Sequence, residues 1–328
     1  MAIATINPAT AEVEQRFEEI SEEELDQRLD AAAAAFDTLR GTTFDQRAAW
    51  MRRAAELLDE EQEATARLVT TEMGKTLKSA RAEVAKCAKG ARYYANHAEA
   101  LLADEPAEAS AVGASAAYGR YQPLGAVLAV MPWNFPLWQA MRFASPGLMA
   151  GNVGLLKHAS NVPQTALYLG DLFRRAGFPQ GAFQTLLIGS SRVEAVIRDR
   201  RVAAVTLTGS GPAGAAVGAV AGECIKPSVL ELGGSDAFVV MPSADLERAA
   251  AVATTARCQN NGQSCIAAKR FIVHEAVAEE FERRFVEKMS GLALGDPTAE
   301  STDIGPLATE QGRDDVEELV ADAVDKGA

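Results

Sequence analysis

Cys265 and Glu231 are the two residues of this chain whose types and settings could carry out covalent chemistry together. Cys265 ends the stretch Asn260-Asn-Gly-Gln-Ser-Cys265, and Glu231, 34 positions earlier, begins Glu231-Leu-Gly-Gly234. A thiol that attacks a carbonyl carbon needs a nearby group that moves protons, and both residues lie in glycine-bearing turns with apolar flanks. The pair therefore predicts nucleophilic catalysis by the cysteine, with the glutamate as a general base.

Each member of the pair also has a purely structural interpretation. Most free cysteines are small buried hydrophobic residues, which is the interpretation favoured for Cys258 because it lies within an expected helix. Cys265 lies instead in an expected loop, where Gly262 lets the backbone approach a ligand and the Cys265 amide could donate to an oxyanion. Glu231 closes a short apolar strand, where partial desolvation would suit a general base. An edge-strand glutamate that faces water fits the sequence equally well.

Three further stretches place polar groups where expected strands end. Asn134 lies in Pro132-Trp-Asn-Phe-Pro136, a rigid loop in which its amide could stabilise an oxyanion or merely serve the turn. Lys157 ends a second strand and suits a ribose hydroxyl or a phosphate. Thr208-Gly-Ser210 ends a third strand and enters a helix whose N-terminus would attract an anion. Because parallel strands end at one edge of a sheet, we expect these groups to converge on one crevice.

The apolar pattern predicts the elements that position these residues. Helical periodicity covers Ser21 to Arg40, Phe44 to Met73 and Leu77 to Leu102, and Ser21 with Glu24 has the spacing of a capping box. Strands are expected at residues 125–131, 153–157, 185–188 and 203–208, alternating with helices at 164–176, 191–199 and 214–224. This alternation predicts a doubly wound parallel α/β sheet, which is a Rossmann-like domain.

A second α/β unit is expected after Gly234. Strands at residues 237–241 and 269–274 alternate with helices at 244–260 and 276–289, and Cys265 lies in the loop between the first helix and the second strand. We therefore divide the chain into a cofactor domain, residues 1–234, and a catalytic domain, residues 235–328.

Length and composition limit the classes of function. A chain of 328 residues that is 48% hydrophobic and 23% charged is expected to form about two domains. Its net charge of -13 argues against non-specific nucleic-acid binding and against anionic membrane surfaces, and it also suits solubility in high salt. The three histidines show no metal-ligand spacing, so no metal is expected. Four cysteines are too few for a disulfide framework, and no signal or spanning segment is evident, so a cytoplasmic protein is expected.

In chain order, these motifs resemble the aldehyde dehydrogenase superfamily. Five blocks arrive near the family's spacing: Pro132-Trp-Asn-Phe-Pro136, Lys157 at 23 positions past Asn134, Thr208-Gly-Ser210, Glu231-Leu-Gly-Gly234 and Gly262-Gln-Ser-Cys265. The resemblance implies NAD(P)-dependent oxidation of a small-molecule aldehyde to a carboxylic acid. It also implies the family's two-domain α/β fold.

Residue roles follow from the resemblance. It implies that Cys265 attacks the aldehyde to form a thiohemiacetal, whose oxyanion is held by the Asn134 side chain and the Cys265 amide. Hydride then passes to the nicotinamide, and Glu231 activates the water that hydrolyses the thioester. The residues implied to line the cofactor are Trp133, Lys157, Ser160, Gly209, Ser210 and Leu232. Relatives that favour NAD often carry a glutamate where this chain has Ser160, so acceptance of NADP besides NAD is implied, and a preference for NADP is left open.

Within the superfamily, Pro136-Leu-Trp-Gln-Ala-Met-Arg142 and Glu231-Leu-Gly-Gly-Ser-Asp236 look like the succinate-semialdehyde dehydrogenases. The implied reaction is the oxidation of succinate semialdehyde to succinate. Arg142 matches an arginine that binds the far carboxylate of the substrate in several such enzymes, although a surface or helix-capping role is equally open. A second substrate arginine of some relatives is Gln259 here, which weakens the assignment to succinate.

Family members usually continue beyond the point that Ala328 matches, into a Glu-x-Phe-Gly-Pro segment that holds the nicotinamide ribose and a last strand that pairs across a dimer. We therefore expect the catalytic domain to be incomplete. A segment near residues 112–123 resembles the family's oligomerisation hairpin and implies a homodimer or tetramer of the full-length chain. Two alternatives stay open: a fragment that binds nucleotide without turnover, and a thiol esterase that needs Cys265, Glu231 and the oxyanion donors but no cofactor.

Overall fold

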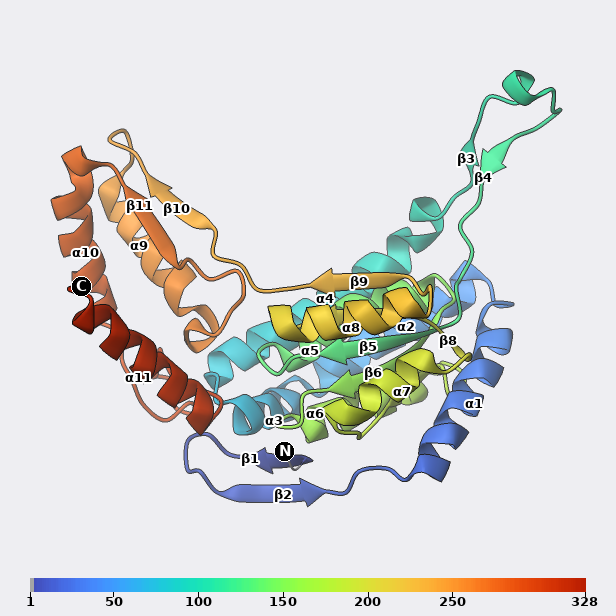
Figure 1. The fold of residues 1–328 in the computed structure, drawn as a ribbon, viewed down its shortest axis with the longest axis horizontal. Coiled ribbons are helices and arrows are strands. Elements are labelled where there is room, and N and C mark those ends of the chain that lie inside the picture. The colour runs from blue at the N-terminus through green and yellow to red at the C-terminus, as the bar shows by residue number, and fades with distance from the viewer. Residues whose placement is uncertain (1–2) are drawn as a thin grey trace.

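The centre of the molecule is a parallel five-stranded sheet. The structure, a computed structural model, describes residues 3–328. The strand order is β7-β6-β5-β8-β9 (Figure 1). The strands are β5 (Ala126–Met131), β6 (Val153–His158), β7 (Phe183–Thr185), β8 (Val202–Thr208) and β9 (Ser228–Glu231). The order reverses at β5, and open parallel sheets bind ligands beside the carboxyl ends of their strands at such a point. The predicted doubly wound parallel fold is confirmed.

The inner strands are apolar because they are covered. All six residues of β6 are buried, and β5 has one partly buried residue, Val130. The helices that connect successive strands pack against the sheet. They are α5 (Pro136–Met149), α6 (Pro163–Arg175), α7 (Val193–Arg198) and α8 (Gly211–Glu223). Strands that lack a solvent face lose the alternating pattern and become continuous hydrophobic runs, which is why they could be predicted.

Three points about the N-terminal helices differ from the prediction. The helix expected over Phe44 to Met73 is divided at Glu61 into α2 (Phe44–Glu60) and α3 (Gln62–Met73). Ser21 caps α1 (Glu22–Leu39) by accepting from the Glu24 amide, but the Glu24 carboxylate pairs with Arg28, so the reciprocal half of the box is absent at this helix. The complete capping box is at α2, between Thr43 and Gln46. The last of these helices, α4 (Leu77–Leu101), agrees with its prediction.

Several elements were not expected from the sequence. The chain begins with an antiparallel pair, β1 (Ile3–Ile6) and β2 (Val13–Phe17), and α5 follows β5 directly. The strand predicted at residues 185–188 lies earlier, at β7, because its ladder with β6 joins Gly154 to Phe183 and Leu156 to Thr185. β1 has four residues, three of them buried. A strand this short offers too few positions for an alternation of apolar and polar residues to be recognised in the sequence.

The segment near residues 112–123 is part of a projecting hairpin (Figure 1). Its two-residue strands, β3 (Glu105–Pro106) and β4 (Tyr118–Gly119), pair antiparallel and are exposed. A 3-10 turn, η1 (Ser110–Val112), lies at the tip, and the Val112 side chain is exposed. The prediction of an oligomerisation segment is compatible with this shape and stays a prediction.

Residues after Gly234 form a second unit with its own small core. A parallel pair, β10 (Ala237–Val240) and β11 (Arg270–Val273), packs with α9 (Leu246–Cys258) and α10 (Ala278–Ser290). Its buried cluster is Val240, Ala250, Ala253 and Phe281. The remaining elements are the 3-10 turns η2 (Ser190–Arg192), η3 (Gln259–Gly262) and η4 (Glu275–Val277) and the helix α11 (Glu310–Asp325). The separate core agrees with the boundary drawn at residues 234 and 235, which stays a prediction.

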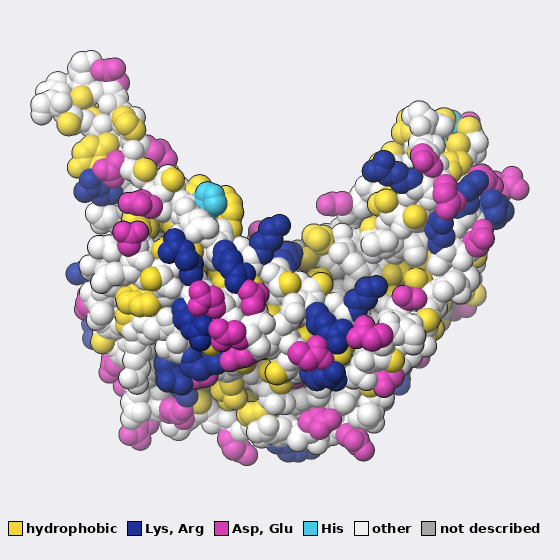
Figure 2. All heavy atoms as spheres, turned by 180° about the vertical axis from the view of Figure 1, so that it is seen from behind, with side chains coloured by type: hydrophobic (Ala, Val, Ile, Leu, Met, Phe, Trp, Pro, Cys, Tyr) yellow, Lys and Arg dark blue, Asp and Glu magenta, His cyan; other side chains and the backbone are white. Residues whose placement is uncertain are grey.

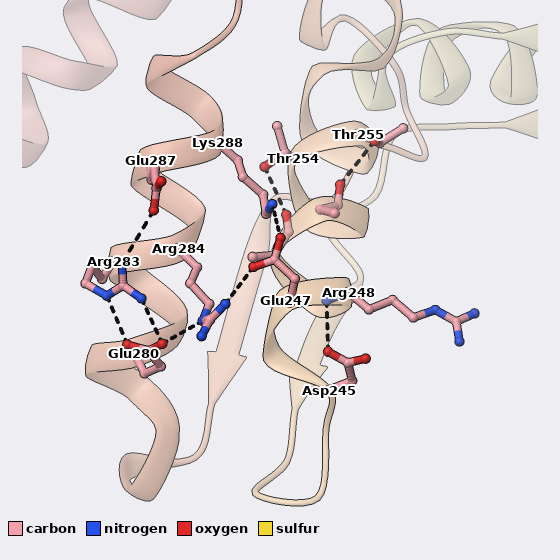
Figure 3. Close-up of polar contacts among 12 residues, drawn as sticks. Asp245, Glu247, Arg248, Thr254, Thr255, Glu280, Arg283, Arg284, Glu287 and Lys288 are labelled. Atoms are coloured by element: carbon pink, nitrogen blue, oxygen red, sulfur yellow. Dashed lines mark hydrogen bonds and ion pairs between the residues drawn. The ribbon is translucent and has the colours of Figure 1, made fainter.

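Charged side chains join the two helices of this second unit (Figure 3). Glu247 on α9 accepts from Arg284 and Lys288 on α10, and Arg284 also donates to Glu280. Glu247 is exposed and the other three side chains are partly exposed, so each ion pair is expected to add little stability.

The excess of acidic residues is not gathered into one patch on the face seen in Figure 2. Lys and Arg side chains alternate there with Asp and Glu, between the hairpin on one side and the second unit on the other. No helix within residues 3–328 combines the length and the apolar character that a membrane span requires.

Candidate active site

Cys265 and Asn134 line one cavity of about 470 Å³ at the carboxyl ends of β5 and β8. The predicted cofactor residues Trp133, Gly209, Ser210 and Leu232 line the same cavity. It is completed by Pro132, Thr208, Gly262, Gln263, Ser264, Lys269, Leu307, Gly312, Asp315 and Val316. Segments from the parallel sheet, from the cysteine loop and from α11 thus line one cavity. A reaction between a bound substrate and a bound cofactor would need such a shared cavity.

The loop of Asn134 is joined directly to the loop of Cys265. The Asn134 side-chain amide donates to the Gln263 carbonyl at 3.1 Å, and its oxygen accepts from the Phe135 amide at 3.1 Å. In return, the Asn260 side chain donates to the Asn134 carbonyl at 2.7 Å. One N–H of the Asn134 amide therefore fixes the side chain, and the group carries a second N–H that can be offered to an oxyanion.

The cysteine loop has an unusual backbone. Asn260, Asn261 and Gly262 have φ values of 58°, 57° and 74°, so three successive residues adopt the left-handed conformation. Asn tolerates this conformation better than most residues, and Gly adopts it freely. The Asn261 side chain holds the turn by donating to the carbonyls of Gly74 (2.8 Å) and Pro306 (2.9 Å) and by accepting from the Gly305 amide at 3.1 Å.

These two asparagines were missed in the sequence, although the run Asn-Asn-Gly was a signal. Lys269 was missed as well. Its ammonium donates to the carbonyls of Gly234 and Cys265, each at 2.6 Å, and so ties the segment after Glu231 to the cysteine loop. A single lysine four positions after a cysteine gives no pattern from which this bridge could be predicted.

Glu231 does not line the cavity, and the partial desolvation expected for it is not found. Its side chain is 55% exposed and forms an ion pair of 3.6 Å with Arg142. The reason is its position: β9 is at the edge of the sheet, and all four of its residues are exposed. The alternative drawn from the sequence, an edge-strand glutamate that faces water, describes its surroundings here. Its role as a base stays a prediction.

Arg142 lies on α5 and faces the ends of β8 and β9. Its guanidinium donates to the Thr208 hydroxyl at 3.2 Å and pairs with Glu231. Arg142 does not line the cavity of Cys265 either. The structure therefore joins the predicted substrate arginine to the predicted base.

Lys157 and Ser160 lie at the end of β6, on the other side of β5 from β8. Lys157 is buried, and desolvation lowers the pKa of its ammonium despite the nearby Glu19 carboxylate. The Ser160 carbonyl accepts from the Ala4 amide at 3.0 Å, which attaches β1 here. Both residues lie at the same end of the sheet as the cavity but do not line it, so the expected convergence of Lys157 on one crevice with Asn134 and Thr208 is not found.

The first turn of α8 suits a phosphate group. Ser210 caps it by accepting from the Ala213 amide, and apart from its chain neighbours and the helix's own backbone, no atom of residues 3–328 lies within 4 Å of a Cβ built on Gly211. Two buried polar atoms of the cavity wall, Gln263 Nε2 and Ser264 Oγ, have no hydrogen-bond partner in the described chain. Open space at a helix N-terminus and unpartnered polar groups in the same wall fit a dinucleotide.

Comparisons with known proteins agree with this geometry. The aldehyde dehydrogenase family model matches residues 1–328. Succinate-semialdehyde dehydrogenase [NADP(+)] 1 of Mycobacterium tuberculosis is 63% identical over 328 residues, which are 100% of this chain and 72% of that protein. Succinate-semialdehyde dehydrogenase [NADP(+)] of Mycobacterium leprae is 64% identical with the same coverage.

A solved structure, succinic semialdehyde dehydrogenase from Streptococcus pyogenes with NADP+ as the cofactor, superposes with a TM-score of 0.96. It is 35% identical, and the match covers 99% of this chain and 71% of that one. The chain belongs to the aldehyde dehydrogenase family.

Proposed function

We propose that this chain oxidises succinate semialdehyde to succinate with NADP as the hydride acceptor. The observation that carries the proposal is that Cys265 and Asn134 line one cavity with Trp133, Gly209 and Ser210 at the carboxyl ends of parallel strands. The substrate and the cofactor are those that the relatives described above are named for.

In the proposed reaction the Cys265 sulfur attacks the aldehyde carbon, and the free N–H of the Asn134 amide and the Cys265 amide stabilise the resulting oxyanion. Bound NADP supplies the hydride acceptor for the oxidation to a thioester. Glu231 then takes a proton from the water that hydrolyses this thioester. Because the Glu231 side chain is exposed and its contact with Arg142 is long, it can turn toward the cavity without breaking a tight ion pair.

The first turn of α8 would hold the phosphates, and Trp133 and Leu232 would line the nicotinamide end. Lys157 and Ser160 would lie toward the adenosine ribose, where a serine brings no negative charge against a 2′-phosphate. Arg142 is the candidate for the substrate carboxylate, for which it would have to exchange its contact with Glu231.

The test is the absorbance of reduced cofactor when the chain receives succinate semialdehyde and NADP. Cys265→Ala should abolish the signal. Glu231→Gln should keep the first turnover and slow the later ones, because it affects hydrolysis after the cysteine is acylated. Glu223→Gln, on the exposed side of α8, is the control.

No cofactor reduction by the wild-type chain would contradict the proposal. Nucleotide binding would then support the fragment without turnover, and ester hydrolysis without cofactor would support the thiol esterase.

The proposal includes a cytoplasmic enzyme that forms a homo-oligomer. The location rests on the sparse cysteines, all four of which are free. The oligomer rests on the exposed hairpin of β3 and β4 and is tested by light scattering of the chain with and without residues 107–117.

A further inference from the structure

Lys75 is a buried lysine beneath the loop of Asn134, and the proposed reaction gives it no part. Its side chain is 0% exposed, and its ammonium pairs with the Glu83 carboxylate, which is 2% exposed. The same ammonium lies 4.3 Å from the centre of the Phe135 ring, within the range of a cation–π contact. Burying two charges costs about as much free energy as their attraction returns, so this pair contributes little to the stability of the fold. A role in positioning neighbouring residues would explain why the pair is present.

Glu83 also holds the start of α5. Its second oxygen accepts from the amides of Leu137 (3.0 Å) and Trp138 (2.9 Å). The residue at the N-cap, Phe135, has no side chain that could do this, and the helix opens with Pro136. Glu83 therefore caps α5 from another helix. The ammonium of Lys75 and the carboxylate of Glu83 together fix the residues that directly follow Asn134.

The neighbouring residue, Gly74, contacts the other half of the site. Its carbonyl accepts from the Asn261 side chain at 2.8 Å, and Asn261 belongs to the loop that carries Cys265. Gly74 ends α3 in the left-handed conformation, with φ of 78°. One turn between α3 and α4 thus contacts the oxyanion loop through Lys75 and the cysteine loop through Gly74.

We propose that the Gly74–Lys75 turn, together with Glu83, sets the separation between the Asn134 amide and the Cys265 sulfur. Lys75 and Glu83 are positioning residues, because they act through Phe135 and α5 and touch no reacting atom. The inference rests on the proposed function only in its use of Asn134 as the oxyanion donor. A shift of about 1 Å in such a donor is expected to slow acyl transfer by on the order of 100-fold.

The test variant is Lys75→Met with Glu83→Gln. Gln keeps an acceptor oxygen for Leu137 and Trp138, Met fills the space of the lysine stem, and no unpaired charge is left buried. The matched control is Glu72→Gln. Glu72 is also buried and caps α6 in the same manner, by accepting from the amides of Gln164 (2.8 Å) and Thr165 (2.9 Å), but it lies under a different helix.

Two reactions of Cys265 are compared, neither of which uses the cofactor. Acylation by p-nitrophenyl acetate passes through an oxyanion, whereas alkylation by iodoacetamide, followed by mass spectrometry of the Cys265 peptide, does not. The double variant should lose at least tenfold in the acylation burst and change less than about twofold in alkylation. Glu72→Gln should leave both rates within about twofold.

An acylation rate close to that of the wild type, or equal loss in the Glu72 control, would overturn the proposal. So would a parallel loss of acylation and alkylation, or a wild-type chain that is alkylated but gives no burst. If the double variant does not fold, Phe135→Leu keeps the ion pair but removes the ring and should show the same selective loss; unchanged acylation there would also overturn the proposal. A wild-type chain that fails to reduce NADP would contradict the proposed function and leave this comparison valid.

Discussion

At the scale of single residues, the predicted catalytic pair has two different environments. Cys265 is partly buried in a cavity with Asn134, the predicted oxyanion donor, and Glu231 is exposed at the edge of the sheet with Arg142. The difference suits successive steps, because the nucleophile needs a fixed partner from the start, whereas the base is needed only once a thioester has formed. Both residues were proposed from the sequence, since their turns carry glycines beside a reactive side chain, and their catalytic roles stay predictions. The environments of the two side chains could not be predicted, because the exposure of Glu231 depends on β9 lying at the edge of the sheet.

His158 gives a prediction at the same scale. It is buried at the end of β6, its Nε2 contacts the Pro136 carbonyl at 2.8 Å, and burial lowers its pKa to about 4. The pKa in the unfolded chain is near 6.5, so between these values the unfolded state binds more protons and the free energy of unfolding falls as the pH falls. Titration of His158 should therefore lower the free energy of unfolding by about 2 kcal/mol between pH 7 and pH 5.

Urea unfolding of the wild type and of His158→Gln at both pH values measures this loss. Gln can donate to the same carbonyl but does not titrate, so the variant should lose less stability on acidification. Equal losses in the two proteins would show that other groups dominate the pH dependence.

At the scale of elements, the two helices that begin with proline, α5 and α6, are both capped by a side chain from another helix. Neither α5 nor α6 has a side-chain cap at its own N-cap residue, and each is capped by a buried glutamate from the N-terminal helices, Glu83 and Glu72. Burial raises the pKa of Glu72, and its four accepted hydrogen bonds oppose this. The periodicity of the N-terminal helices could be predicted, but buried glutamates in them could not, because a glutamate in a helix is normally exposed.

Gly74→Ala tests the turn between α3 and α4. A Cβ there would lie 3.0 Å from Pro306 Cγ and 3.1 Å from the Pro306 carbonyl oxygen, and φ of 78° disfavours any L side chain. We expect a loss of about 1–3 kcal/mol in the free energy of unfolding. Gly222→Ala is the control: it lies in α8, and apart from its chain neighbours and the helix's own backbone, no atom of the described residues lies within 4 Å of a new Cβ, so the change should be neutral or stabilising by about 0.5–1 kcal/mol. Similar losses in both variants would contradict the argument.

At the scale of the whole molecule, a few side chains attach the second unit to the first. Asn261 contacts the turn at Gly74 and the segment at Gly305 and Pro306, while Asn260 contacts the Asn134 loop. The cavity lies at this junction. Its shape therefore depends on contacts between parts of the chain that are far apart in sequence.

Asn261→Ala should loosen the junction without unfolding the sheet. Amide hydrogen exchange is expected to accelerate at residues 260–265 and 305–308, while β5 and β6 keep their protection, because three hydrogen bonds to other segments are lost. Asn96→Ala removes an exposed asparagine that contacts Arg52 and should leave both regions unchanged. Faster exchange throughout the sheet would mean that the second unit is not a separate attachment.

The sequence by itself determined the parallel sheet and the family, and it singled out Cys265 as the candidate nucleophile, because buried parallel strands and glycine-bearing turns leave local patterns. The Pro132-to-Pro136 loop, the Thr208 turn and Cys265 could be identified for the same reason. Tertiary structure alone decided that Glu231 is exposed beside Arg142, that Lys157 lies outside the cavity of Cys265 and that Lys75 lies beneath Phe135. These facts concern distances between segments that are remote in the chain, and a periodicity within one segment carries no information about such distances.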